Sequence, residues 1–340
     1  MTAPVTPPPV TPPPHWQTRG PLAMLLLPVA ALFAAVAALR RLAYGCGVLS
    51  VQHAGVPVII VGNITAGGTG KTPLTLWLAQ FLRSRGRHPG IISRGYGAPC
   101  TDPRAVPVDG GTAAYGDEPC LLARRAGCPV WVGTDRAATA HALRAAHPAT
   151  DVIISDDGLQ HYRLGRDFEI AVIDGAQGLG NGWPLPAGPL REPASRLALV
   201  DAVVVNGGDA ARAFPQAIAM HLEGGEFRNL RNPGLTVTAA HFRNRRVHAV
   251  AGIGNPQRFF EHLQRLGVAG TAHPFPDHHA FVAADLQFAG TDDIVMTEKD
   301  AVKCTAFATE NHWALVVNAA IDTRLGDMIL ARLAQATRHG

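Results

Sequence analysis

One segment constrains the fold of this chain more than any other. Residues 56–72 read VPVIIVGNITAGGTGKT, an apolar run that leads into a glycine-rich turn and then into Gly70-Lys71-Thr72. After the turn, apolar residues recur at helical spacing as far as Leu82. A buried strand, a glycine-rich loop and a helix in this order form a phosphate-binding loop, because glycines let backbone N–H groups approach phosphate oxygens. The segment therefore predicts a nucleotide site in an α/β fold.

The last residues of this loop have separate expected roles. Lys71 is expected to reach the β- and γ-phosphates of ATP, and the hydroxyl of Thr72 is expected to bind Mg²⁺. The residues expected to bind the nucleotide are Thr65, Ala66, Gly67, Gly68, Thr69, Gly70, Lys71 and Thr72. Thr65 departs from the usual pattern, since G-x-x-x-x-G-K-S/T has its first glycine at that position.

Two classes of nucleotide switch fit this sequence less well. ATPases of the ParA and MinD type have a lysine directly before the Gly-Gly pair, where this chain has Ala66. GTPases recognise guanine with N/T-K-x-D, and residues 297–300 (TEKD) have the lysine one position too late. Both switch classes are disfavoured.

Short apolar runs alternate with helical stretches after Val56, which is typical of buried parallel strands connected by helices. The expected strands are Val58–Val61, Gly90–Ile92, Val152–Ile154, Ile170–Ile173 and Ala202–Val205, and the expected helices include Pro73–Ser84 and Ala137–Ala146. This alternation predicts an α/β fold built on a P-loop NTPase-type parallel sheet with helices on both faces.

A second α/β set begins near Val247 and predicts a smaller C-terminal domain. We place the boundary between residues 207 and 246. The predicted division is a P-loop domain over residues 46–235 and a C-terminal α/β domain over residues 236–340.

The N-terminal residues predict a tail and a membrane anchor. Residues 1–15 are rich in proline and are expected to form a disordered tail. Within residues 16–45, the uncharged stretch Pro21–Leu39 would form a helix about 28 Å long, close to the thickness of a hydrocarbon core. A cleaved signal peptide and a buried amphipathic helix are alternatives. The pair Arg40-Arg41 favours a cytoplasmic location for the domains that follow, and an exported protein would find no ATP.

An acidic pair stands at the end of one expected strand. Residues 150–161 read TDVIISDDGLQH, so Asp156 and Asp157 follow an apolar run. Parallel strands end at the sheet edge where α/β proteins bind ligands, and acids at that position hold the magnesium ion facing a nucleotide. His161 is either a site residue or a capping histidine.

Other polar motifs and the cysteines are less informative by themselves. Gly116-Asp117-Glu118-Pro119 is an acidic turn or helix start, and residues 276–279 (PDHH) are equally ambiguous. Pro274 and Pro276 break the helical spacing that a histidine metal site would need. The chain has five cysteines and no C-x-x-C pair, so neither a zinc site nor a disulfide framework is expected.

The basic residues are few in excess and are nearly all arginine. Formal net charge is only +4 and no long basic run occurs, which disfavours a nucleic-acid partner. The chain has only three lysines, Lys71, Lys299 and Lys303. A chain this biased toward arginine is expected to keep lysine where a compact, flexible ammonium matters, although chance placement is an open alternative for Lys299 and Lys303.

Taken together, these motifs resemble those of tetraacyldisaccharide 4'-kinase, the lipid A pathway enzyme of Gram-negative bacteria. The matching stretches are the N-terminal hydrophobic helix, VGNITAGGTGKTP, SRGYG (93–97), GDEP (116–119), DDGLQH (156–161), LPAGPLREP (185–193), FPDHHAF (275–281) and TEKDAVK (297–303). The resemblance runs from about residue 16 to about residue 335, and a small hydroxyl residue at position 65 is usual in that family.

The resemblance implies transfer of the ATP γ-phosphate to the 4'-hydroxyl of a tetraacylated glucosamine disaccharide 1-phosphate, which gives the bis-phosphorylated lipid A precursor. It implies that Asp117 is the base, that His278 tunes it, and that Asp156 and Asp157 serve magnesium and the reacting centre. Four further residues belong to the site by similarity: Glu118, Tyr96, His161 and Arg191.

The implied setting is the cytoplasmic face of a bacterial inner membrane. The partners are then the acylated disaccharide phospholipid and membrane lipid, with no required protein partner, and the C-terminal domain closes over the active site. The competing hypothesis is a membrane-tethered P-loop ATPase switch or assembly factor. A kinase predicts little ATP turnover without the acceptor lipid, whereas a switch predicts stimulation by a protein partner.

Overall fold

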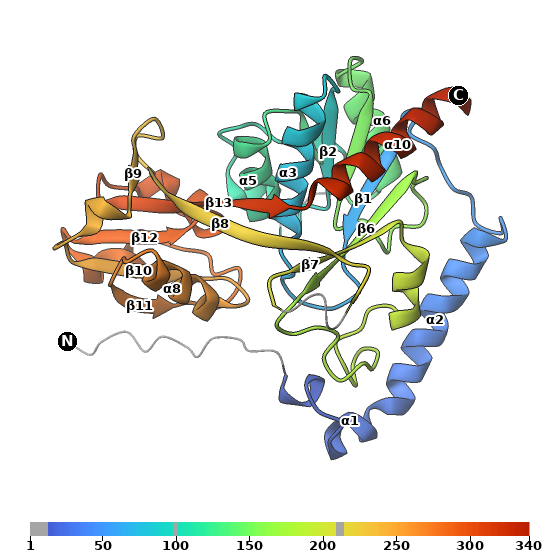
Figure 1. Ribbon diagram of the computed structural model, residues 1–340, viewed down its shortest axis with the longest axis horizontal. Coiled ribbons are helices and arrows are strands. Elements are labelled where there is room, and N and C mark those ends of the chain that lie inside the picture. The colour runs from blue at the N-terminus through green and yellow to red at the C-terminus, as the bar shows by residue number, and fades with distance from the viewer. Residues whose placement is uncertain (1–12, 98–100, 209–213, 340) are drawn as a thin grey trace.

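The computed structural model describes residues 13–97, 101–208 and 214–339. Within these ranges a single sheet of 13 strands runs through the whole molecule (Figure 1), in the order β11-β10-β12-β13-β8-β7-β6-β1-β5-β2-β4-β3, with β9 paired to β8. The strands are β1 Val58–Gly62, β2 Pro89–Ser93, β3 Arg104–Ala105, β4 Val130–Val132, β5 Val152–Asp156, β6 Phe168–Asp174, β7 Ala202–Asn206, β8 Ile218–Asn229, β9 Thr236–Thr238, β10 Val247–Ala251, β11 Thr271–Pro274, β12 Asp293–Thr297 and β13 His312–Ile321.

The described α-helices comprise α1 and α2, which lie beside the sheet as a separate arm, and others that cover its two faces (Figure 1). They are α1 Pro21–Leu25, α2 Leu27–Gly45, α3 Lys71–Ser84, α4 Thr112–Tyr115, α5 Asp117–Arg125, α6 Arg136–Ala146, α8 Pro256–Arg265, α9 Glu298–Cys304 and α10 Thr323–His339. The five predicted strands and the two predicted helices are all present, with ends that differ by one or two residues.

Strand β1 explains why the phosphate loop sits at the centre of the molecule. It lies between β5 and β6, parallel to both. Successive strand residues point to opposite faces, so Ile59 and Val61 enter one buried core and Val58 and Ile60 enter another. Helices α3, α5 and α10 contribute to the first core and α6 to the second. The prediction of a P-loop NTPase-type sheet covered on both faces is confirmed.

We call strands β1–β7 with α3–α6 and α10 the phosphate-loop lobe, and strands β9–β12 with α8 and α9 the C-terminal lobe. The C-terminal lobe has a second parallel set, β11-β10-β12, between two smaller cores. Phe259 and Leu263 of α8 enter one of these cores, and Ala301 and Cys304 of α9 enter the other.

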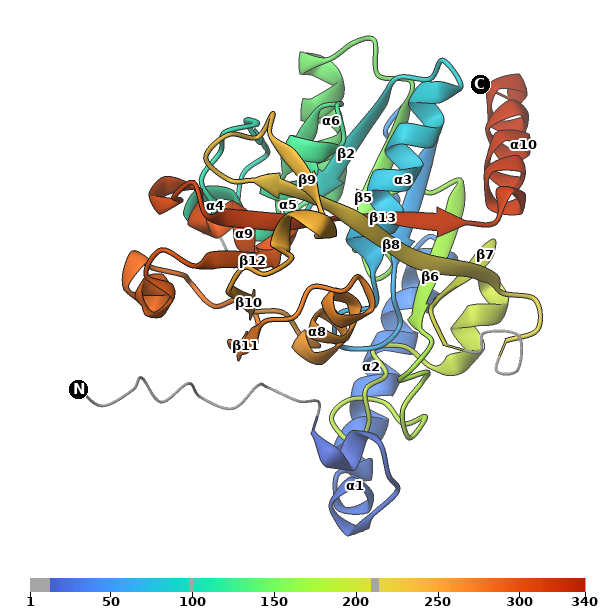
Figure 2. The ribbon, with the colours of Figure 1, turned by 60° about the vertical axis from the view of Figure 1, so that its left-hand side comes forward.

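Two long antiparallel strands, β8 and β13, connect the lobes. They pair from Trp313 opposite Asn229 to Ile321 opposite Met220, with a bulge between Val316 and Val317. Helix α10 then returns to the phosphate-loop lobe in both views (Figures 1 and 2), where its buried residues join the same core as α3. Those residues are Leu325, Ile329 and Leu333. The division at residues 235 and 236 stays a prediction, and these three residues of α10 pack with the first lobe.

The N-terminal helix differs from its prediction. The stretch Pro21–Leu39 is not one helix, because α1 ends at Leu25 and α2 begins at Leu27 and continues through Arg40 and Arg41 to Gly45. Pro28 accounts for the break, since its nitrogen has no hydrogen to bond the preceding turn. Of the predicted tail over residues 1–15, residues 1–12 lie outside the described residues, and Pro14 and His15 belong to the 3-10 helix η1 (Pro14–Trp16).

Candidate active site

The phosphate loop runs from the end of β1 to the start of α3. Gly67 and Gly70 have φ angles of 109° and 91°, which residues other than glycine rarely adopt. Gly70 also meets β7, because a Cβ there would lie 2.3 Å from Asn206 Nδ2. Asn206 Nδ2 donates a hydrogen bond to the Thr69 carbonyl at 3.1 Å. Glycine is therefore required where the loop crosses the end of β7.

Lys71 faces the acidic pair at the end of β5. Its Nζ lies 3.4 Å from Asp157 Oδ1, and Arg191 Nη1 lies 3.5 Å from Asp157 Oδ2. Burial alone would raise the pKa of Asp157, but Lys71 and Arg191 together hold that pKa below its ordinary value. Asp157 is therefore ionised at neutral pH and is the counter-ion of Lys71.

The adjacent carboxylate has the opposite electrostatic environment. Asp156 is buried and accepts a hydrogen bond from Thr75 Oγ1 at 3.0 Å. Burial, with the negative charges of Glu118 and Asp157 nearby, raises the pKa of Asp156 to about 7. Asp156 is thus protonated more readily than an ordinary aspartate, and a cation beside it would favour the charged form.

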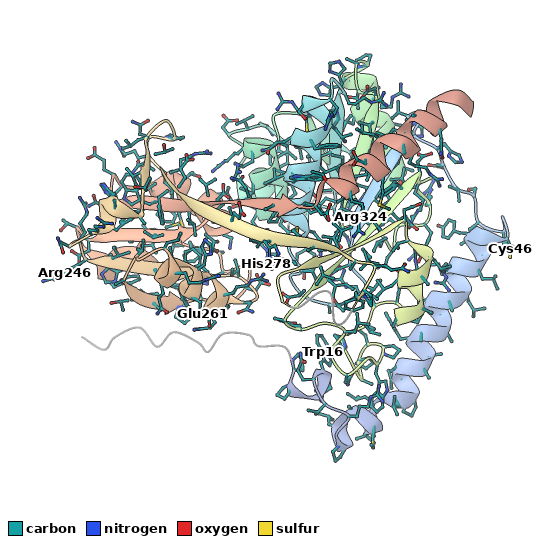
Figure 3. The ribbon with its side chains drawn as sticks, viewed as in Figure 1. Trp16, Cys46, Arg246, Glu261, His278 and Arg324 are labelled. Atoms are coloured by element: carbon teal, nitrogen blue, oxygen red, sulfur yellow. The ribbon has the colours of Figure 1, made fainter. Side chains whose placement is uncertain are left out.

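A second acid meets a histidine from the other lobe. Asp117 begins α5, and its Oδ2 lies 3.0 Å from His278 Nδ1 in the loop that follows β11. Figure 3 shows His278 near the junction of the lobes. The ring of Tyr96 lies 5.4 Å from that of His278. The sequence separates the two groups by 161 positions, and the fold brings them into contact.

Neighbouring charged groups and a hydrogen bond determine the protonation states of Asp117 and His278. Burial would raise the pKa of Asp117, but the hydrogen bond with His278 and the charges of Lys299 and Lys303 lower it to about 2. The same hydrogen bond raises the pKa of His278, against the opposing effects of burial and of Lys299. Near neutral pH, Asp117 is therefore a carboxylate, and its contact favours the imidazolium form of His278.

A cleft of about 1200 Å³ opens between the lobes. Its walls include Gly68–Thr72 of the phosphate loop, Glu118 of α5 and Lys299 of α9. The cleft is large enough for a nucleotide together with part of a second substrate. The phosphate loop lines this cleft, and the carboxylate–histidine pair adjoins it through Glu118 and Asp277. Together with the acid pair that faces Lys71, these groups can carry out phosphoryl transfer to a hydroxyl.

Comparisons with known proteins agree with this geometry. The family described as LpxK, tetraacyldisaccharide-1-P 4'-kinase, matches residues 22–334. The chain belongs to the tetraacyldisaccharide-1-P 4'-kinase family. Tetraacyldisaccharide 4'-kinase of Azoarcus sp. strain BH72 is 52% identical over 329 residues, which cover 96% of this chain and 95% of the relative. That of Methylobacillus flagellatus is 51% identical over 310 residues, 91% of this chain and 92% of the relative.

A solved structure supports the same assignment. The crystal structure of LpxK from Aquifex aeolicus in complex with ATP is 27% identical to this chain, with a TM-score of 0.77. The match covers 92% of this chain and 99% of that one. The predicted family, fold class and kinase activity are confirmed, and the roles of single residues stay predictions.

The structure separates the predicted site residues of this kinase into two groups. Lys71, Asp157 and Arg191 form one set of contacts, and Asp117, His278 and Tyr96 form another. Asp156 lies beside the first set, and Glu118 lines the cleft next to the second. His161 is near the first set: burial, then the charges of Arg136 and Arg94, lower its pKa to about 4, against the opposing charge of Asp157.

Five residues in or beside the cleft were not predicted as site residues. They are Asp174, Asn206, Arg258, Lys299 and Lys303. Asp174 and Asn206 end strands β6 and β7, so the rule that found Asp156 could have found them. Arg258 of α8 bonds Asn206 at 3.1 Å and Asp174 at 3.4 Å, and no motif marked it. The scarcity of lysine marked Lys299 and Lys303, but gave them no role.

The raised pKa of Asp156 predicts a stability that depends on pH. With a folded-state pKa of about 7 and an ordinary unfolded value, the folded protein binds more protons between these two values. Stability should therefore fall as pH rises toward 7, and Asp156→Asn should remove this loss. We expect the nucleotide-free Asp156→Asn variant to melt at a higher temperature than the parent at pH 8, and at a similar temperature at pH 4.5. Equal melting temperatures at pH 8 would contradict the raised pKa.

Proposed function

We propose that this chain transfers the γ-phosphate of ATP to the 4'-hydroxyl of a tetraacylated glucosamine disaccharide 1-phosphate, with Asp117 accepting the hydroxyl proton. Membership of the family makes the chain a kinase of lipid A biosynthesis that phosphorylates a 4'-hydroxyl. The observation that carries the proposed residue roles is the 3.0 Å contact between Asp117 and His278 beside the cleft that the phosphate loop lines.

ATP is expected to bind with its phosphates on residues 65–72. The backbone N–H groups of the loop and the start of α3 provide positive ends of dipoles, and Lys71 adds a full charge. In the present contacts that charge is balanced by Asp157. A γ-phosphate beside Lys71 would compete with Asp157 for the ammonium group, which supports a role for Asp157 at the reacting centre.

The oxygen groups around Asp156 suit Mg²⁺. The ion is usually bound by one or two carboxylates, water and substrate phosphates rather than by a full protein cage. Among the described residues, no three His, Cys, Asp or Glu side chains form a metal cluster, which is consistent with that mode. The negative charges of Glu118 and Asp157 disfavour the ionised form of Asp156, and a bound cation would favour that form. Thr72 and Asp156 would hold the ion, which neutralises phosphate charge when bound.

The transfer step needs a proton acceptor beside the attacking oxygen. The 4'-oxygen forms a bond to the γ-phosphorus, the bond from that phosphorus to the bridging oxygen of ADP breaks, and the hydroxyl proton moves to Asp117. Phosphoryl transfer has a loose transition state, so the hydroxyl loses its proton to a weak base as the new bond forms. The low pKa of Asp117 keeps it unprotonated beforehand, and His278 orients it.

The membrane helix is proposed to lie along the inner membrane rather than across it. Helix α2 passes the length and hydropathy criteria for a membrane span, and only 6% of its apolar window is buried. Both of its flanks bind the same lobe, however. Before α1, the Trp16 carbonyl accepts the Asn181 N–H at 2.7 Å, and after α2 the Gln52 N–H bonds Arg163 at 2.7 Å. A bilayer cannot lie between these contacts, so both flanks share one side.

This placement brings the active site to its acceptor. Four acyl chains hold a lipid in the bilayer at about 0.8 kcal/mol per buried CH₂. An in-plane helix exposes apolar residues such as Leu25, Leu32 and Leu39 to the acyl region. Because ATP is available only in the cytoplasm, we place both lobes on the cytoplasmic face.

Lys71→Ala tests the reaction. With labelled ATP and the disaccharide lipid, the parent should yield a doubly phosphorylated lipid, and Lys71→Ala should lower the rate by roughly three orders of magnitude or more, because it removes charge stabilisation at the transferring group. Circular dichroism should show an unchanged fold. A folded variant with near-normal turnover would refute the phosphate-loop assignment.

A double-mutant cycle tests the proposed base. Asp117→Ala and His278→Ala should each lower kcat, and the double variant should be little worse than the poorer single one, because the residues act as a pair. The measurement is kcat at saturating ATP and lipid. Losses that simply multiply would mean that His278 acts independently of Asp117.

Protease accessibility tests the in-plane helix. An epitope tag fused before Met1 should stay protected in intact spheroplasts and be digested after lysis, since residues before α1 remain with the cytoplasmic lobe. A periplasmic protein should be digested in the same spheroplasts as a control. Digestion of the tag from outside would show that α2 spans the membrane.

A further inference from the structure

The ammonium group of Lys299 contacts carboxylates from both lobes beside the proposed catalytic pair. Lys299 Nζ lies 3.2 Å from Glu118 Oε1, 3.8 Å from Asp117 Oδ2 and 3.8 Å from Asp277 Oδ1. The first two carboxylates begin α5 in the phosphate-loop lobe, whereas Asp277 directly precedes His278. Lys299 is thus in contact with the base and with the loop that carries its histidine.

The histidine loop needs such support. His278 has a φ of 59°, which is unfavourable for a residue other than glycine, and its side chain is 37% exposed. Its backbone N–H bonds Asp277 Oδ1 at 3.0 Å, the same oxygen that faces Lys299. A chain of contacts therefore runs from Lys299 through Asp277 to the backbone of His278, and from its ring to Asp117.

Lysine suits this position better than arginine. An ammonium is compact and directs three donors in different directions, whereas a guanidinium is a flat fork suited to one carboxylate. Lys299 meets three carboxylates at once. Although burial lowers the pKa of Lys299, the charges of Glu118, Asp117 and Asp277 raise it above its ordinary value, so the side chain stays charged.

We infer that Lys299 is a positioning residue for phosphoryl transfer, which holds the His278 loop against Asp117 and so fixes the geometry of the catalytic base. The inference rests on the proposed function, in which Asp117 takes the hydroxyl proton. Lys299 acts through the pair, and its effect on the reaction requires Asp117.

Lys299→Met is the test variant. We expect kcat to fall roughly 10- to 100-fold with little change in KM for ATP, because misplacing a catalytic group by about 1 Å has an effect of that size. The charge of Lys299 also lowers the pKa of His278. The hydrogen bond with Asp117 has a larger effect on this pKa, in the raising direction. Displacing the His278 loop from Asp117 should therefore move the NMR titration of the His278 ring to lower pH, whereas loss of the charge alone would move it to higher pH. His278→Gln identifies the signal.

Arg125→Met is the matched control. Arg125 also joins α5 to α9, through Glu298, and it bonds Asn318 at 2.7 Å. It should lower the melting temperature but leave kcat and the His278 titration unchanged. Should Lys299→Met fold poorly, Lys299→Gln keeps a hydrogen-bond donor without the charge and carries the same expectations.

The Asp117→Ala background decides between mechanisms. Lys299→Met should add no further loss of kcat there, since its effect requires the base. An equal further loss would overturn the inference, and would mean that Lys299 contacts the transferred phosphate itself. A raised KM for ATP with unchanged kcat and an unmoved His278 titration would overturn it as well. If Asp117→Ala alone keeps normal kcat, the proposed base fails, and the role of Lys299 fails with it. If Lys299→Met keeps a normal kcat while Asp117→Ala is inactive, only the role proposed for Lys299 is overturned.

Discussion

The charge of one buried carboxylate determines how this kinase is assembled. Asp117 belongs to the phosphate-loop lobe, yet its cations, His278, Lys299 and Lys303, all come from the C-terminal lobe. A buried carboxylate without partners would be costly, so each lobe completes the electrostatics of the other. The candidate active site therefore lies at the junction, and neither lobe contains all of its residues.

The continuous sheet holds the two lobes in a fixed relative position. Strands β8 and β13 pass from one lobe to the other as a hydrogen-bonded pair, and α10 fixes the end of β13 to the core beneath the phosphate loop. The two lobes are thus joined by backbone pairing as well as by ion pairs. This connection explains how side chains 161 positions apart meet at 3.0 Å beside a cleft that still admits substrates.

Local patterns predicted local structure well and distant contacts poorly. The phosphate loop and the strand ending at Asp156 are encoded in short stretches, because glycine content and apolar runs act over a few residues. Asp117 and His278 lie in turns that are ordinary by themselves, and only the resemblance to a family paired them. The return of α10 and the break before Pro28 were missed. The first depends on tertiary packing, and the second follows from a proline that the length argument did not weigh.

The loop that follows β6, residues 175–193, contacts both the phosphate loop and the residues that precede the apolar helices α1 and α2. Asn181 Nδ2 donates a hydrogen bond at 2.8 Å to the carbonyl of His15, which lies just before the apolar helices begin. It also bonds the carbonyl of Ala187 in its own loop at 2.9 Å. A few residues later, the Pro189 carbonyl accepts the N–H of Ala66 at 2.8 Å. One loop therefore sets the position of the phosphate loop relative to the apolar helices α1 and α2. With α2 in the membrane as we propose, this fixed offset would determine where a lipid headgroup must lie to reach the nucleotide.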